Sequence, residues 1–302
     1  MRKGISLVLI TALISGLANF FNKFAMQALA KDAFQYTFLK NILVALVFSL
    51  LILMPWILPK LKKLSKNDWL KILCLGLVGG GIPFMLFFKG LSLTSAVSAS
   101  FIHKTLFIWV AIFAWPFLKE KISIWQFGAL GVLLWGNMIF EGFKGLSWGI
   151  AETLILGATL FWAFETILVK KFLANIDFMV LAWGRMFFGS LIIFAFLVTT
   201  NNLAGLTALN QIQVLWIVLV SFLLCGYVLT WYAALNKLPA TIVASVLVLA
   251  SPITTLMNSI FVTHKVMASN QIFGLGLISF SIIFLIYYIL LRYNLNNFSE
   301  QK

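Results

Sequence analysis

The sequence has 302 residues, of which 62% are hydrophobic and only 10% are charged. Soluble domains contain roughly 45–50% apolar and 25% charged residues, so this composition excludes an ordinary soluble fold. The net charge is +14, but the charges lie in short breaks between apolar runs rather than on one polar face. We therefore expect a membrane protein without a nucleic-acid partner.

Ten apolar runs follow one another along the chain, and each is about as long as the 20-residue helix that crosses a bilayer core. Membrane β-strands would be about 10 residues long and would alternate apolar with polar positions, which these runs do not. The sequence thus predicts an all-α integral membrane protein with ten transmembrane helices. They are expected at 4–29, 36–58, 70–91, 94–118, 123–141, 147–170, 178–200, 213–235, 238–262 and 268–291.

Lys and Arg residues outside the spans fall mostly on one side of the expected membrane. With the N-terminus placed inside, fourteen lie on the inner side and three, namely Lys31, Lys144 and Lys265, lie outside. Cytoplasmic loops are enriched in Lys and Arg. We therefore expect both termini to be cytoplasmic.

The second half of the sequence repeats the first. Lys40 matches Arg185, and Gly4 matches Gly149, both at an offset of 145 residues; near the fourth and ninth spans the offset is 144. Five spans per repeat is an odd number, so the second copy must enter the membrane from the opposite side. This predicts an inverted repeat, an architecture common among secondary transporters. The expected repeats cover 1–143 and 144–302.

Several short motifs recur in a set order. The second half reads Tyr232-x-Ala234-Leu235-x-x-x-Pro239-Ala240, then Ser251-Pro252, then Gln271-x-x-Gly274. The first half has the looser copies Phe88-x-Gly90-Leu91-x-x-x-Ser95-Ala96 and Leu118-Lys119-Glu120. In order and duplication, this pattern resembles the drug/metabolite transporter superfamily, specifically its ten-span EamA type.

The resemblance implies transport of a small molecule across the inner (plasma) membrane, through a central cavity lined mainly by spans 3, 4, 8 and 9. No cofactor is predicted, and the sequence leaves open whether the protein is a monomer or a homodimer. The chain departs from the family pattern in two places. Ile108 stands where the second copy has Pro252, and the ninth span ends in Thr263-His264-Lys265 instead of the usual Gly-Glu.

His103 and Lys104 lie deep in the apolar fourth span, where a charge is costly and usually marks function. Ser100 shares a helix face with His103, and Lys104 lies about 100° further round the helix. We predict that Lys104 binds an anionic group and that His103 orients it or takes a proton. The alternatives are that Lys104 extends to the membrane interface and that His103 only bonds a neighbouring helix.

Glu165 and Arg185 are the candidate charged residues of the sixth and seventh spans. Glu165 is predicted to carry a proton or to be the counter-ion of Arg185 or Lys104; the alternative is a salt bridge within its own helix to the lysines at 170–171. Arg185, the repeat partner of Lys40, is predicted to face an anionic substrate, and the alternative is contact with lipid phosphates.

Three further residues complete the predicted substrate site. Trp109 and Tyr232 are aromatic residues on cavity-lining spans and can stack on a ligand; the alternative is packing or lipid contact. Asn19 belongs to a polar stripe on the first span, where it either lines the cavity or bridges helices. No metal ligands and no catalytic residues are predicted.

The glycine run before Pro83 and the proline at 252 interrupt the third and ninth spans. Proline removes a backbone donor and kinks a helix. These breaks are either gates or plain packing features.

The predicted function is secondary transport by alternating access. No Walker A motif is present, so ATP is not expected to drive it directly. Basic residues outnumber acidic residues inside the spans. This excess favours a small metabolite with a carboxylate or phosphate, such as an amino acid or a nucleotide-like compound. The alternatives are proton-coupled efflux of cationic or hydrophobic drugs through Glu165 and a non-transporting membrane scaffold. Neither clustered acids nor a His/Asp motif suggests an enzyme.

Overall fold

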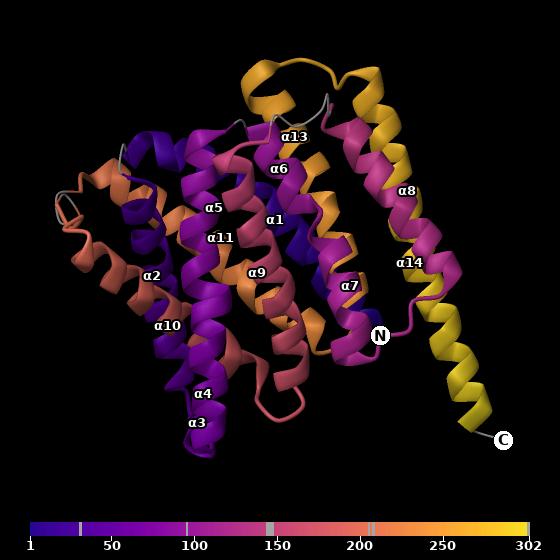
Figure 1. The fold of residues 1–302 in the computed structure, drawn as a ribbon, viewed down its shortest axis with the longest axis horizontal. Coiled ribbons are helices and arrows are strands. Elements are labelled where there is room, and N and C mark those ends of the chain that lie inside the picture. The colour runs from indigo at the N-terminus through magenta and orange to yellow at the C-terminus, as the bar shows by residue number, and fades with distance from the viewer. Residues whose placement is uncertain (30–31, 95, 143–147, 205, 207–208, 301–302) are drawn as a thin grey trace.

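The computed structural model describes residues 1–29, 32–94, 96–142, 148–204, 206 and 209–300. Every regular element among them is a helix (Figure 1). Nine helical spans in these ranges are long and apolar enough to cross a membrane, and a shorter apolar helix, Ile124–Phe140, makes a tenth. The prediction of an all-α membrane protein with ten spans is confirmed. The expected repeat boundary at 143/144 lies outside the described residues.

The first five spans are formed by helices α1 to α8 and the last five by α9 to α14. The first set is α1 Arg2–Leu29, α2 Ala33–Ile52, α3 Leu58–Lys62, α4 Lys66–Leu75, the π-helix η1 Gly76–Gly81, α5 Ile82–Leu93, α6 Ala96–Lys104, α7 Leu106–Leu118 and α8 Ile124–Phe140. The second set is α9 Ile150–Phe172, α10 Phe178–Thr199, α11 Gln211–Leu235, α12 Ala240–Val246, the 3-10 helix η2 Leu247–Leu249, α13 Ala250–Asn258, the π-helix η3 Ser259–Thr263 and α14 Ser269–Glu300.

The second span is shorter than expected. It ends at Ile52 rather than near position 58, because the residue before a proline is disfavoured in the helical region and Pro55 follows closely. The short helix α3 then occupies part of the stretch that was expected to be a loop.

The residues that cap helix N-termini occur at equivalent positions in the two repeats. Asp32 caps α2 and Asp177 caps α10, each accepting a hydrogen bond from the backbone N–H two residues later. Ser65 and Asn210 form capping boxes at the starts of α4 and α11. Members of each pair are 145 residues apart in the sequence. The repeat is therefore present in local backbone chemistry as well as in the motifs.

The two π-helices account for the change of offset between repeats. A π-helical turn accommodates one residue more than an α-helical turn. In the first repeat η1 precedes the region where the offset drops to 144, and in the second repeat η3 precedes the return to 145. Lys119 and His264, 145 residues apart, end the fourth and ninth spans in the same left-handed conformation, with φ of 55° and 52°.

Packing between the repeats is reciprocal. Helix α1 packs against α11 and α13, and its counterpart α9 packs against α5 and α7. Helix α2 packs against its own counterpart α10, and α8 packs against α14, a pair that stands at one edge of the molecule (Figure 1). Such an exchange of partners is what a two-fold relation between the repeats predicts.

The fourth and ninth spans both break near their middles. Helix α6 ends at Lys104, and the Thr105 hydroxyl donates to the Ile102 carbonyl at 2.6 Å before α7 begins. At the equivalent place, η2 interrupts the ninth span one turn before Pro252. The prediction that Pro252 disturbs its helix thus agrees with the observed break, since proline cannot donate to the carbonyl four residues earlier.

Candidate functional site

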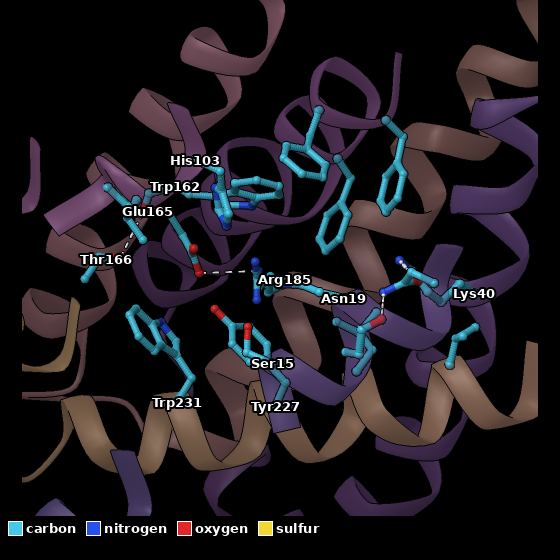
Figure 2. Close-up of a pocket in the computed structure, with 18 residues that line it drawn as sticks. Ser15, Asn19, Lys40, His103, Trp162, Glu165, Thr166, Arg185, Tyr227 and Trp231 are labelled. Atoms are coloured by element: carbon cyan, nitrogen blue, oxygen red, sulfur yellow. Dashed lines mark hydrogen bonds and ion pairs between the residues drawn. The ribbon is translucent and has the colours of Figure 1, made fainter. Parts of the chain in front are cut away.

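A cavity with a volume of about 110 Å³ lies where helices of the two repeats meet (Figure 2). This volume has room for several water molecules or a small solute. Polar and charged side chains line it together with aromatic rings, which is the composition expected of a ligand site. The lining residues are Ser15, Ala18, Asn19, Asn22, Lys40, Phe84, Phe87, Phe88, His103, Leu106, Trp162, Glu165, Thr166, Arg185, Val220, Leu224, Tyr227 and Trp231.

A buried ion pair forms one wall of the cavity. Glu165 on α9 and Arg185 on α10 approach to 3.3 Å between Oε1 and Nε, and both are almost fully buried. The hydroxyl of Tyr232 donates to the same Glu165 oxygen at 2.6 Å. The Arg185 Nη1 atom finds no hydrogen-bond partner within the described residues. Because Glu165 is held by two donors, its charge is largely compensated by the protein itself.

The glycine run of η1 makes room for this pair. A Cβ atom on Gly79 would lie 2.5 Å from the Glu165 Cγ, and one on Gly80 would lie 2.0 Å from the Arg185 carbonyl oxygen. The Gly79 carbonyl, in turn, accepts hydrogen bonds from Arg185 Nε at 3.2 Å and from Trp162 Nε1 at 3.1 Å. The run that interrupts the third span therefore positions the charged groups of the cavity.

Lys40 enters the cavity within a ring of aromatic side chains. Its Nζ lies 4.2 Å from the centre of the Phe88 ring, 5.0 Å from that of Tyr36 and 5.6 Å from that of Phe84. Its hydrogen-bond partner is the Oδ1 of Asn22, at 3.4 Å. No acidic side chain lies within 4 Å of Lys40 in the described part of the chain. Cation–π contacts stabilise such an ammonium, but they do not neutralise it.

His103 and Lys104 lie in different surroundings although they are neighbours in sequence. The His103 ring lines the cavity between Trp162 and Phe87, at centroid distances of 5.0 and 5.2 Å. Lys104 is buried and is not among the residues that line the cavity; its electrostatic partner is Glu141, and its Nζ has no hydrogen-bond partner in the described structure. The assignment of Lys104 to a substrate site stays a prediction.

Ser100 lies beside Glu141 rather than in the cavity. Its hydroxyl donates to Glu141 Oε1 at 3.0 Å and lies 3.3 Å from the hydroxyl of Ser251 on α13. Together with Lys104, these groups form a second polar cluster, which joins the fourth, fifth and ninth spans. The sequence signal for Glu141 was a lone acid at the end of an apolar run, and the sequence prediction did not include it.

The remaining predicted residues divide between the cavity and its surroundings. Asn19 lines the cavity, and Tyr232 reaches its wall through Glu165. Trp109 lies elsewhere and donates its indole N–H to Thr105 Oγ1 at 3.2 Å. Four of the eight predicted residues thus line the cavity, namely Asn19, His103, Glu165 and Arg185.

Arg185, Lys104 and the lysines of its own helix were the basic partners considered for Glu165, and the structure pairs it with Arg185. Lys170, the candidate partner within its own helix, instead donates to the carbonyls of Leu235 and Leu238 at 2.6 and 2.7 Å.

Lys40 lines the cavity, but the predicted substrate site did not include it. Its match with Arg185 at the 145-residue offset was the sequence signal that could have placed it there.

The fold and the cavity together define a class of protein. A duplicated, ten-span helical membrane protein with a charged cavity between its repeats has the architecture of a secondary transporter. The sequence model of the EamA-like transporter family matches residues 2–140 and again residues 149–287. The chain therefore belongs to the EamA-like transporter family, and the resemblance drawn from its motifs is confirmed.

Individual relatives agree with this family. An "Uncharacterized transporter" of Clostridium kluyveri is 25% identical over 288 residues, which cover 91% of this chain and 90% of that protein. An "Uncharacterized transporter" of Methanothermobacter thermautotrophicus is 28% identical over 119 residues, 37% of this chain and 34% of that protein. A solved crystal structure matches with a TM-score of 0.73 and 14% identity, covering 93% of this chain and 96% of that one. That last likeness shows the fold alone.

Proposed function

We propose that this protein is a secondary transporter that moves a small metabolite bearing a carboxylate or phosphate across the plasma membrane by alternating access. The cavity carries two cationic side chains, Lys40 and Arg185, and one acidic side chain, Glu165, among its lining residues. Glu165 is already engaged by Arg185 and Tyr232. The observation that carries the proposal is the remaining cation, Lys40, which has no acidic partner among the described residues and favours a substrate with negative charge.

The arrangement of the repeats supports alternating access. The cavity is lined from both repeats, and the helices that line it exchange partners reciprocally. In transporters built from inverted repeats, the two halves can exchange conformations and so open the same site to either side of the membrane. The breaks in the fourth and ninth spans lie at equivalent positions and are suited to such a motion.

Charge distribution supports cytoplasmic termini. Helix α3, which carries Lys60 and Lys62, lies in the lower half of the view together with both chain ends (Figure 1). In the expected topology, the lysines at 170 and 171 lie on the same side of the membrane as the two termini. An end of the molecule that carries most Lys and Arg residues faces the cytoplasm by the positive-inside rule.

Efflux of cationic or hydrophobic drugs is less well supported by the geometry. That function would use Glu165 as the group that binds a cation or a coupling proton. In the structure, a cationic drug would have to displace Arg185 from Glu165, and a proton on Glu165 would leave the buried Arg185 without its counter-ion. Such displacement is costly in a buried site.

Transport by the purified protein in lipid vesicles tests the proposal. The panel should contain amino acids, other carboxylates, phosphorylated metabolites and cationic dyes, each with and without a pH gradient, and protein-free vesicles are the control. We expect saturable flux of at least one solute that carries an anionic group. Flux of cations alone that is lost in Glu165→Gln would establish drug efflux instead, and no flux of any solute would favour the scaffold.

A further inference from the structure

Lys40 and Arg185 are equivalent residues of the two repeats. Lys40 lies eight positions after the helix cap Asp32, and Arg185 lies eight positions after the cap Asp177. Both line the same cavity (Figure 2). Each cation also contacts a matching aromatic ring, since Lys40 lies over Phe88 and Arg185 over Tyr232, rings at corresponding positions of the third and eighth spans.

The two cations differ in their counter-ions. Arg185 has the carboxylate of Glu165, but the position that corresponds to Glu165 in the first repeat, 145 residues earlier, is Phe20. No other acid takes its place, because no Asp or Glu in the described residues lies within ion-pair distance of Lys40. The first repeat thus has the cation without the carboxylate.

The surroundings of Lys40 leave its ammonium group incompletely satisfied. Only 3% of Lys40 is exposed. An ammonium has three donors. Within the described part of the chain, Lys40 makes one hydrogen bond, the long contact to Asn22 Oδ1, an oxygen that also accepts from the Tyr36 hydroxyl. A buried charge in a membrane protein normally pairs with another group or marks a substrate path. Lys40 faces the cavity, so a ligand there can supply what the protein lacks.

We propose that Lys40, with Asn22 beside it, is the subsite that binds the carboxylate of the transported solute. The inference rests on the proposed function and narrows it from carboxylate or phosphate to carboxylate. Lys40 offers one uncompensated charge, which matches one carboxylate. A phosphate carries about −1.5 to −2 at neutral pH and is best bound by the paired donors of arginine. The charge of Arg185 is already paired with Glu165, which leaves its Nη1 as an unpartnered donor among the described residues but no uncompensated charge.

The isosteric change Asn22→Asp is the main test. It would place a carboxylate 3.4 Å from the Lys40 ammonium and so give the first repeat the ion pair that the second repeat has. If Lys40 binds substrate, this internal carboxylate competes with the ligand, and carboxylate binding weakens while the fold is retained. If Lys40 has only a structural role, carboxylate binding survives in Lys40→Gln, whatever the effect of Asn22→Asp.

Binding is measured on the full-length protein in detergent, through the change in total tryptophan fluorescence, to which Trp162 and Trp231 of the cavity contribute. The probes are amino acids and short monocarboxylates, the primary amide of each, and inorganic phosphate. We expect one or more carboxylates to bind and their amides to bind at least about tenfold more weakly, the effect of losing one charge-assisted hydrogen bond. Lys40→Gln and Asn22→Asp should weaken carboxylate binding by a similar factor, and Lys40→Arg should retain part of it.

The exposed neighbour Lys89 on α5 provides a matched control, and Lys89→Gln should bind as the unmodified protein does. Carboxylate binding that survives Lys40→Gln, or binding of phosphate without any carboxylate, would overturn the inference, as would a panel in which no carboxylate binds. Vesicle flux separates this failure from failure of the proposed function. Flux that Lys40→Gln leaves intact contradicts the subsite alone, whereas carboxylate binding without flux contradicts transport alone.

Discussion

Glu120 and Thr241 connect the two repeats at one end of the molecule. The Glu120 carboxylate, in the turn after α7, accepts hydrogen bonds from the Thr241 hydroxyl at 2.8 Å and from the Ala240 N–H at 2.9 Å. It thereby caps the start of α12, where helix N–H groups have no partners of their own. Lys170 on α9 bonds the carbonyls of Leu235 and Leu238 nearby. The start of the ninth span is therefore held by groups from the fourth and sixth spans.

Replacing Glu120 should loosen this end of the molecule. We expect Glu120→Ala to lower the melting temperature, because loss of an N-cap costs about 1 kcal/mol. It should also raise the rate at which a cysteine at Thr166, on the cavity wall, reacts with a membrane-impermeant thiol reagent, in a chain whose own two cysteines are replaced. Glu120→Asp is the conservative control. Unchanged labelling in Glu120→Ala would show that this contact does not restrict access to the cavity.

The ion pair of Glu165 and Arg185 predicts strong coupling between the two residues. Removing one partner leaves a buried, unpaired charge, which costs about 3–5 kcal/mol. We expect Arg185→Met to lower the melting temperature sharply, and the double variant Glu165→Gln/Arg185→Met to recover most of the loss. Thermal unfolding of the single and double variants in detergent measures this coupling. Additive effects of the two changes would contradict a direct pairing.

Gly80 should tolerate no side chain. A Cβ atom there would lie 2.0 Å from the Arg185 carbonyl oxygen, which belongs to the backbone and cannot rotate away. We expect Gly80→Ala to cost about 1–3 kcal/mol, as other overpacked sites do, and to reduce expression of folded protein. Gly128 and Gly131 on α8 are matched controls, since nothing lies within 4 Å of a Cβ at either position. Alanine at those positions should be neutral or stabilising by up to about 1 kcal/mol.

Lys104 and Glu141 influence each other electrostatically without a direct ion pair among the described residues, and their role can be separated from that of the cavity. We expect Lys104→Met to destabilise the protein because it leaves the partly buried Glu141 without its cationic neighbour. The double variant Lys104→Met/Glu141→Gln should regain stability and retain the affinity of the unmodified protein for its substrate. Lost substrate affinity in a double variant of full stability would instead support the substrate role that the sequence predicts for Lys104.

Sequence patterns alone were sufficient to predict the ten spans, the all-helical fold, the duplication and the family. Each of these depends on local properties: the length and apolarity of a run, the spacing of caps and motifs, and the number of spans per repeat. A bilayer requires about 20 apolar residues and a fully bonded backbone in every span, so membrane helices can be recognised before their neighbours are known.

Only the tertiary structure decided which charged groups meet. His103 and Lys104 are adjacent in sequence, yet one lines the cavity and the other lies by Glu141. Glu165 pairs with Arg185 on the next span, whereas Lys40, at the position equivalent to Arg185, has no acid within ion-pair distance in the described ranges. Helical spacing shows which residues share a face, but the partner of that face depends on helix packing, and here the packing depends on glycines at the η1 contact and on the exchange of helices between repeats.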